Sequence, residues 1–138
     1  MNTVIRRRYA DIAHTVLRVA AGLLFAQHGA QKLFGALGGF GPPPGGRVQL
    51  LSLMGLAGVI EFFGGILIAL GVLTRPVALV AAAEMAVAYV MAHAPRGVWP
   101  ILNQGEPALL YCFVFLYLAA AGPGPHSVDA RRPVARMA

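Results

Sequence analysis

Two glutamates, Glu61 and Glu84, lie near the middle of two separate apolar stretches of this chain. They are two of only five acidic side chains in the sequence. A carboxylate at the centre of a bilayer costs about 2.5–3.5 kcal/mol on insertion scales, so membrane helices keep one where it faces a partner, a cavity or a site. The two residues therefore mark where chemistry is expected.

The composition is that of a membrane protein. Of the 138 residues, 58% are hydrophobic and 12% are charged, whereas a soluble domain is about 25% charged. The net charge of +6 comes largely from arginines outside the apolar stretches, at Arg6–Arg8 and at Arg131, Arg132 and Arg136. This is the pattern of cytoplasmic ends, without a basic patch of interleaved aromatics. We expect the lipid bilayer as a partner and no nucleic acid.

Four apolar stretches predict an all-α integral membrane four-helix bundle, with spans at about 12–34, 50–73, 76–93 and 100–121. The last is short between 107 and 121, so a broken or re-entrant lead-in covered by protein is expected before it. The segments 35–49 and 94–105 are predicted as irregular loops. Four spans place both termini on one side, and the arginine bias makes that side the cytoplasm, with both loops outside.

Helical periodicity and depth predict an inner polar cluster. Arg18 lies on a polar stripe of the first span that should face the bundle interior. Counting ~1.5 Å per residue from the cytoplasmic end places Arg18, Glu84 and Glu61 at about 9, 12 and 18 Å. An arginine side chain bridges such offsets, so we predict that Arg18 pairs with the two carboxylates.

A second, outer cluster is predicted beneath the two loops. His28 and Glu106 lie at about 24 and 22 Å on the same scale. His93 and Lys32 are close to that level, and Asn103 joins them if the lead-in enters the membrane.

Several readings of these clusters remain open. In the inner cluster, Arg18 neutralises one glutamate while the other is protonated, or the three residues form a structural ion-pair network, or they are a proton-relay or substrate site. In the outer cluster, Lys32 reaching the interface and Glu106 at a helix N-terminus give a structural reading. The alternative is a carboxylate and an imidazole that exchange protons with the oxygen of a quinone-like head group.

Other chemistry finds little support. His28 and His93 lack paired metal-ligand spacing, so no metal is expected. Cys112 is the single cysteine, which excludes an intramolecular disulfide and a dithiol relay within the chain. The sequence has no GxGxxG, P-loop, HExxH or GxSxG. No cofactor is evident beyond a quinone, and redox electrons would come from a partner chain or pass to a lipid-soluble carrier.

A set of segments between about residues 17 and 130 resembles a known protein family. It comprises HGAQKLFG (28–35), GVIEFFGGILIALGVLTRPVAL (58–79), EMAVAYVMAHAPRGVWPILNQGEPALLYCFVFLYLAAAGPG (84–124) and HSVDA (126–130). Together these segments resemble the DoxX family of small bacterial membrane proteins. The resemblance implies a four-helix protein of the bacterial cytoplasmic membrane. Some relatives are subunits of a thiosulfate:quinone oxidoreductase, and others are membrane partners in oxidative-stress complexes or in quinone and catechol resistance.

The resemblance also implies one four-span domain over 1–130, followed by a basic cytoplasmic tail over 131–138. The resemblance leaves two kinds of partner open, namely a soluble or membrane oxidoreductase and a second copy of the chain in a homo-oligomer. Combined with the depth comparison, it nominates these site candidates: His28, Gly29, Gln31, Lys32, Glu61, Glu84, His93, Asn103 and Glu106.

Three functions fit these expectations. The first is a membrane subunit or partner of a quinone-linked redox or oxidative-stress system, which leaves open whether the chain is itself catalytic. The second is a non-catalytic scaffold that anchors soluble partners. The third is a small-molecule or proton conductor, because a polar stripe with midplane carboxylates is what a pathway would contain.

Overall fold

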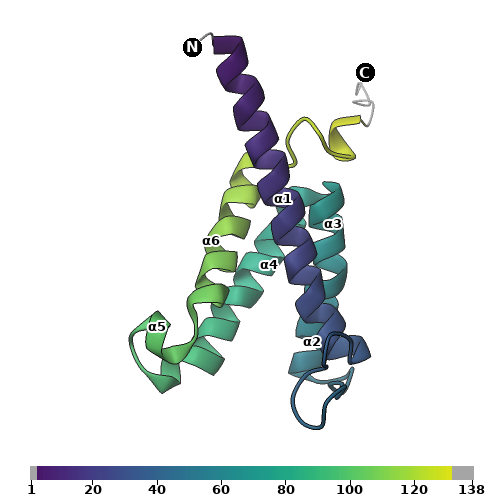
Figure 1. The fold of residues 1–138 in the computed structure, drawn as a ribbon, viewed down its shortest axis with the longest axis vertical. Helices are drawn as coiled ribbons and strands as arrows, with labels where there is room; N and C mark the ends of the chain where they lie inside the picture. Colours follow the sequence, from purple (N-terminus) through teal and green to yellow (C-terminus); the bar gives the residue numbers. More distant parts are fainter. Residues whose placement is uncertain (1–2, 132–138) are drawn as a thin grey trace.

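The computed structural model describes residues 3–131, and every regular element in that range is a helix (Figure 1). The expected all-α membrane bundle is confirmed. Three of the helical stretches are long and apolar enough to cross a membrane: Thr3–Phe34, Leu53–Leu70 and Thr74–Arg96. Arg132 and Arg136, assigned above to a basic tail, lie outside the described residues.

The first helix, α1 (Thr3–Phe34), begins earlier than the apolar pattern alone predicts. Arginine is a good helix former, so the run Arg6–Arg8 continues the helix beyond its apolar part. Figure 1 shows these first turns projecting past the other helices. The helix ends where Gly35 adopts a left-handed φ of 67°, as glycine commonly does after a helix.

The next helical stretch contains one widened turn. It consists of α2 (Leu53–Val59), a π-helical turn η1 (Ile60–Gly64) and α3 (Gly65–Leu70). It begins at Ser52, whose hydroxyl accepts a hydrogen bond from the Gly55 N–H. It ends at Gly71, where φ is 73°.

Glycines bring α1 into backbone contact with this stretch. A Cβ placed on Gly22 would lie 2.6 Å from the carbonyl oxygen of Gly65. A Cβ on Gly29 would overlap the backbone nitrogen of Phe62. The recurring small residues therefore serve close helix packing here, as they do in many membrane proteins.

The second half of the chain forms α4 (Thr74–Ala88), a second π-helical turn η2 (Tyr89–His93), a 3₁₀ turn η3 (Ala94–Arg96), α5 (Pro100–Asn103) and α6 (Glu106–Ala121). The α5 helix occupies the expected lead-in, and Gln104, with a φ of 60°, separates it from α6. The 16 residues of α6 extend about 24 Å at 1.5 Å per residue.

The helices form two arms, one of α1 with α2–α3 and one of α4 with α6. Figure 1 shows the arms diverging toward the end that carries α5 and the loop at 35–52. Between the arms, Phe25, Ile68, Phe115 and Leu118 have no exposed surface. This apolar layer separates the wide end of the bundle from the narrow end.

Arg75 and His14 close the narrow end by contacting carbonyl oxygens at the end of α6. Arg75 donates to the carbonyl oxygens of Ala119 and Ala120 at 3.1 and 2.5 Å, which are among the last carbonyls of α6. His14 Nε2 lies 3.0 Å from the carbonyl oxygen of Gly122. Positive groups favour the C-terminal end of a helix because its free carbonyls carry partial negative charge.

Candidate functional site

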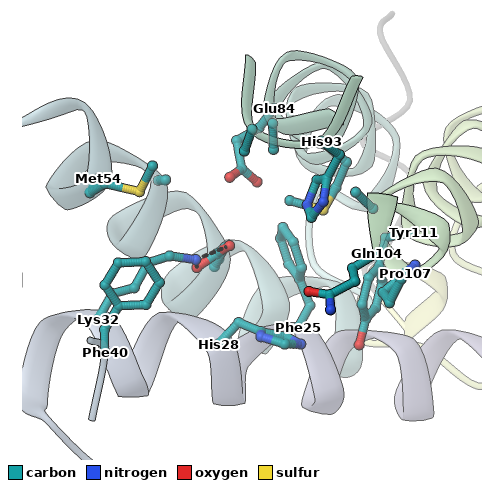
Figure 2. A pocket seen from close by; sticks show the side chains of 16 residues that line it. Phe25, His28, Lys32, Phe40, Met54, Glu84, His93, Gln104, Pro107 and Tyr111 are labelled. Atoms are coloured by element: carbon teal, nitrogen blue, oxygen red, sulfur yellow. Dashed lines mark hydrogen bonds and ion pairs between the residues drawn. The ribbon is translucent and has the colours of Figure 1, made fainter. Parts of the chain in front are cut away.

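A cavity of about 390 Å³ lies between the two arms at the wide end of the bundle (Figure 2). Aromatic rings, methionines and alanines supply most of its wall, including Phe25, Met54, Met85 and Ala108. The polar side chains that line it are His28, Lys32, Glu61, Glu84, His93 and Gln104. An apolar chamber with a few convergent polar groups is the usual composition of a small-molecule site.

A buried ion pair forms part of the wall. Lys32 Nζ lies 2.5 Å from each carboxylate oxygen of Glu61, and the side chains are 11% and 3% exposed. The pair joins α1 to the π-helical turn η1. A charge taken out of water needs such a partner to be tolerated. The Phe40 ring covers the ammonium group from the loop, with its centroid 5.4 Å from Nζ.

Glu84 differs from Glu61 in its surroundings. One carboxyl oxygen, Oε2, is buried and has no hydrogen-bond partner among the described residues. Figure 2 shows the carboxyl group pointing into the cavity. An unpaired buried polar group costs about 1–3 kcal/mol, so this oxygen is available to a ligand.

His93 and the loop that follows it form the opposite wall. His93 Nδ1 lies 3.0 Å from the carbonyl oxygen of Asn103. The Asn103 side chain, which is 1% exposed, donates to the carbonyl oxygen of Gly97 at 2.8 Å and accepts from the Gly105 N–H at 2.8 Å. These bonds fix the turn that presents Gln104 to the cavity.

Glu61 and His93 each lie in a π-helical turn, η1 and η2 respectively. Such turns are rare, and they occur frequently at functional sites. A π turn adds one residue to the hydrogen-bonded ring and thereby changes the direction of the side chains in it. Both arms have such a turn at the cavity, which indicates that the local backbone is adapted to this site.

The predicted pairing of Arg18 with Glu61 and Glu84 is wrong. The buried guanidinium of Arg18 donates to the carbonyl oxygens of Ile68 at 2.8 Å and His126 at 2.7 Å, and also to that of Ala69. The physical reason is that the last carbonyls of α3 have no donor four residues further along the helix and lie within reach of Arg18. Lys32 instead supplies the positive charge for Glu61.

The structure merges the two predicted clusters into one site. Glu61 and Glu84 from the inner cluster share the cavity with His28, Lys32 and His93 from the outer one. The sequence predicted two clusters because it gives only the depth of each residue along its own helix. It does not show that α1 approaches η1.

Four nominated residues lie around this site without lining it. One is Asn103, whose hydrogen bonds fix the turn before α6 as described above. Glu106 is exposed in the first turn of α6, where negative charge is favoured. Gln31 donates to the carbonyl oxygen of Leu37 at 3.2 Å and supports the loop. Gly29 serves helix packing, as described above. Among residues 3–131, no group of three or more His, Cys, Asp or Glu side chains is arranged to hold a metal ion.

Gln104 and Tyr111 are among the cavity residues that sequence reasoning did not nominate. Gln104 precedes Gly105 at the break between α5 and α6, and a polar side chain at such a break was a usable signal. Tyr111 lies one turn from Pro107 and from Phe115 on α6, so the spacing of these residues places them on one helix face.

The apolar spanning helices and the cavity define a multi-pass membrane protein of the helical class. The sequence profile described as DoxX matches residues 13–94. A protein of Haemophilus influenzae (strain ATCC 51907 / DSM 11121 / KW20 / Rd) with the description "Uncharacterized protein" is 37% identical over 132 residues, covering 88% of this chain and 92% of the relative. No solved structure matches the chain. The chain belongs to the DoxX family.

Proposed function

We propose that this DoxX-family protein is the membrane-embedded binding subunit of a redox system. In this proposal the cavity holds the head group of a quinone-type, lipid-soluble carrier. A soluble or membrane oxidoreductase partner supplies the electrons, because the sequence has no nucleotide or flavin motif of its own.

The single observation that carries the proposal is the composition of the cavity. Its volume of about 390 Å³ is within the range of small-molecule sites, ~300–1,000 Å³. Rings and methionines suit the flat apolar body of such a carrier, while Glu84 and His93 are polar groups placed to meet the oxygens of its ring. A carboxyl and an imidazole within reach of a ring oxygen are also groups able to exchange protons with it.

The apolar layer bears on the two other functions considered. Phe25, Ile68, Phe115 and Leu118, all without exposed surface, lie between the cavity and the narrow end. A proton or solute conductor needs a polar path through the bundle, and this layer interrupts it. A scaffold for soluble partners would not need a cavity with an unpaired carboxyl oxygen. It is therefore the favoured function if the protein binds no ligand.

A cavity-filling substitution tests the proposal. Purified full-length protein in lipid nanodiscs is titrated with a decyl-tailed benzoquinone, and binding is followed by quenching of intrinsic fluorescence. Ala88→Phe fills the cavity and is expected to weaken binding at least about tenfold. Ala83→Phe, on an exposed position of the same helix, is the matched control and should bind like the wild type. Equal binding by the two variants would overturn the placement of the ligand in this cavity.

The proposal includes an orientation. The arginine bias supports a bacterial cytoplasmic membrane location with both termini in the cytoplasm, which puts the cavity end toward the outside. A reporter that is active only outside the cytoplasm, fused after residue 40, should be active, whereas the same reporter at the C-terminus should be inactive. The reverse pattern would contradict this orientation.

A further inference from the structure

The hydrogen bond of His93 determines which ring nitrogen faces the ligand. Nδ1 lies 3.0 Å from the carbonyl oxygen of Asn103, and a carbonyl oxygen can only accept. Nδ1 therefore carries the proton, and in a neutral imidazole the other nitrogen, Nε2, is then an acceptor. Nε2 makes no hydrogen bond to any residue within 3–131.

The surroundings hold this ring in place. Tyr89, one π-helical turn earlier, stacks on His93 with ring centroids 6.3 Å apart and planes inclined by 22°. The side-chain bonds of Asn103 to Gly97 and Gly105 fix the backbone that carries the accepting carbonyl. The acceptor at Nε2 is thus built into the fold before any ligand arrives, and Figure 2 shows the ring extending toward the cavity.

Glu84 adds a second acceptor. A carboxyl group keeps an acceptor oxygen whether it is protonated or ionised, and Glu84 Oε2 has no partner in the described part of the chain. The cation that could compensate it, Lys32, directs its donors to both oxygens of Glu61.

We infer that the cavity selects a ligand whose polar head donates hydrogen bonds, namely the aromatic diol form of a quinone-type ring in preference to its dicarbonyl form. This inference rests on the proposed function and names the state of the ligand that binds. A hydroxyl group satisfies His93 Nε2 or Glu84 Oε2. A ring carbonyl facing Nε2 of the neutral His93 ring, or facing an ionised Glu84, places two acceptors together and leaves that acceptor unpaired, which a polar site discriminates against strongly.

The test measures the affinities of both redox forms of one probe under anaerobic conditions. Wild-type protein in nanodiscs is titrated with the decyl-tailed benzoquinone and with the same molecule kept reduced as the diol. The diol is expected to bind about fivefold to tenfold more tightly, as one net hydrogen bond implies. Probes without the decyl tail are titrated in parallel to identify the source of the ligand. If the tail raises the affinity by more than its partition into lipid explains, the ligand is a membrane carrier. If the affinities with and without the tail are equal after this correction, the ligand is a soluble aromatic diol.

Two variants, each with a control variant, assign the preference to these acceptors. His93→Phe keeps an aromatic ring against Tyr89 and should reduce the ratio of the two affinities, whereas His126→Phe at an exposed position is the control. Glu84→Leu should weaken diol binding, whereas Glu84→Gln retains an acceptor oxygen and should not. These Glu84 variants decide the matter if His93→Phe fails to fold.

The outcomes separate the two proposals. Binding of both forms with equal affinity by the wild type overturns the selectivity and leaves the quinone-type site standing. Absence of binding by either form overturns the proposed function, and the selectivity with it. A diol preference that survives both His93→Phe and Glu84→Leu overturns the assignment to these acceptors.

Discussion

Lys32 Nζ is equidistant from the two carboxylate oxygens of Glu61, at 2.5 Å from each. The pair ties α1 to the π-helical turn η1 within the apolar part of the bundle. It also makes the two membrane glutamates unequal, because Glu61 has a cation and Glu84 has an oxygen without a partner among residues 3–131. One carboxyl group thus stabilises the fold while the other is left for the cavity.

Removal of one member of this pair should destabilise the protein strongly. Lys32→Met leaves the buried Glu61 without its cation, and breaking such pairs costs about 3–5 kcal/mol. The free energy of unfolding, measured by SDS titration in mixed micelles, should fall by about that amount. The double variant Lys32→Met/Glu61→Leu should recover most of the loss, because no unpaired charge remains. A double variant as unstable as the single one would show that the ion pair is not the cause.

Enlargement of Gly29 should disrupt the α1 contact. A Cβ at this position overlaps the backbone of Phe62, so Gly29→Ala must separate two helices and should lower stability by several kcal/mol, on the order of the larger core defects. At Gly64 the nearest atom to an added Cβ is Val77 Cγ1 at 3.5 Å, which is ordinary contact. Gly64→Ala is therefore the control, with unfolding expected near that of the wild type. Similar effects of the two substitutions would contradict the close approach of α1 to η1.

Gln104 should show opposed effects on stability and binding. Its φ of 60° is left-handed, a conformation that costs a non-glycine residue about 1–2 kcal/mol. Gln104→Gly should raise the unfolding free energy by roughly 0.5–1 kcal/mol after the entropy of glycine is counted, yet weaken binding of the decyl-tailed probe. Gln104→Asn keeps an amide and tolerates this φ, so it should weaken binding less. A Gln104→Gly variant that binds normally would remove this side chain from the site.

Arg18 should affect stability without affecting the cavity. Arg18→Met removes its donors to the carbonyl oxygens of Ile68 and His126, and hydrogen bonds to charged groups are worth about 1.5–3 kcal/mol. We expect a loss of about that size and faster proteolysis near His126, where the bond to the last segment is lost. Probe affinity should stay within about twofold of the wild type, a difference of under ~0.5 kcal/mol. A large change in affinity would mean that the two ends of the bundle are coupled.

The helices could be predicted from apolar length and composition, but the partner of each buried charge could not. The Gly- and Pro-rich segments interrupted the chain where loops occur, and α5 occupies the expected lead-in. A comparison of depths placed Arg18 near the glutamates. Its actual partners are carbonyl oxygens in the last turn of α3, which lack the regular helical donor. That depends on where α3 stops, at Gly71, and the apolar pattern continues past this residue.

The two π-helical turns were also beyond sequence reasoning. A constant angle per residue predicts the direction of side chains only along a regular helix. At η1 and η2 one extra residue per turn changes that direction, and these turns carry Glu61 and His93. The residue types at the site were therefore found from the sequence, while their convergence on one cavity was not.

The glycine contacts give the cavity one rigid wall and one compliant wall. Between α1 and its neighbours, backbone meets backbone at Gly22 and Gly29, where the nearest atoms are backbone atoms that cannot rotate away. Across the arms, η1 meets α4 at Gly64 through the side chain of Val77. For the proposed quinone-type ligand, we therefore expect head groups of different width to be accommodated by displacement of α4 and α6, with Lys32 and Glu61 as a fixed reference.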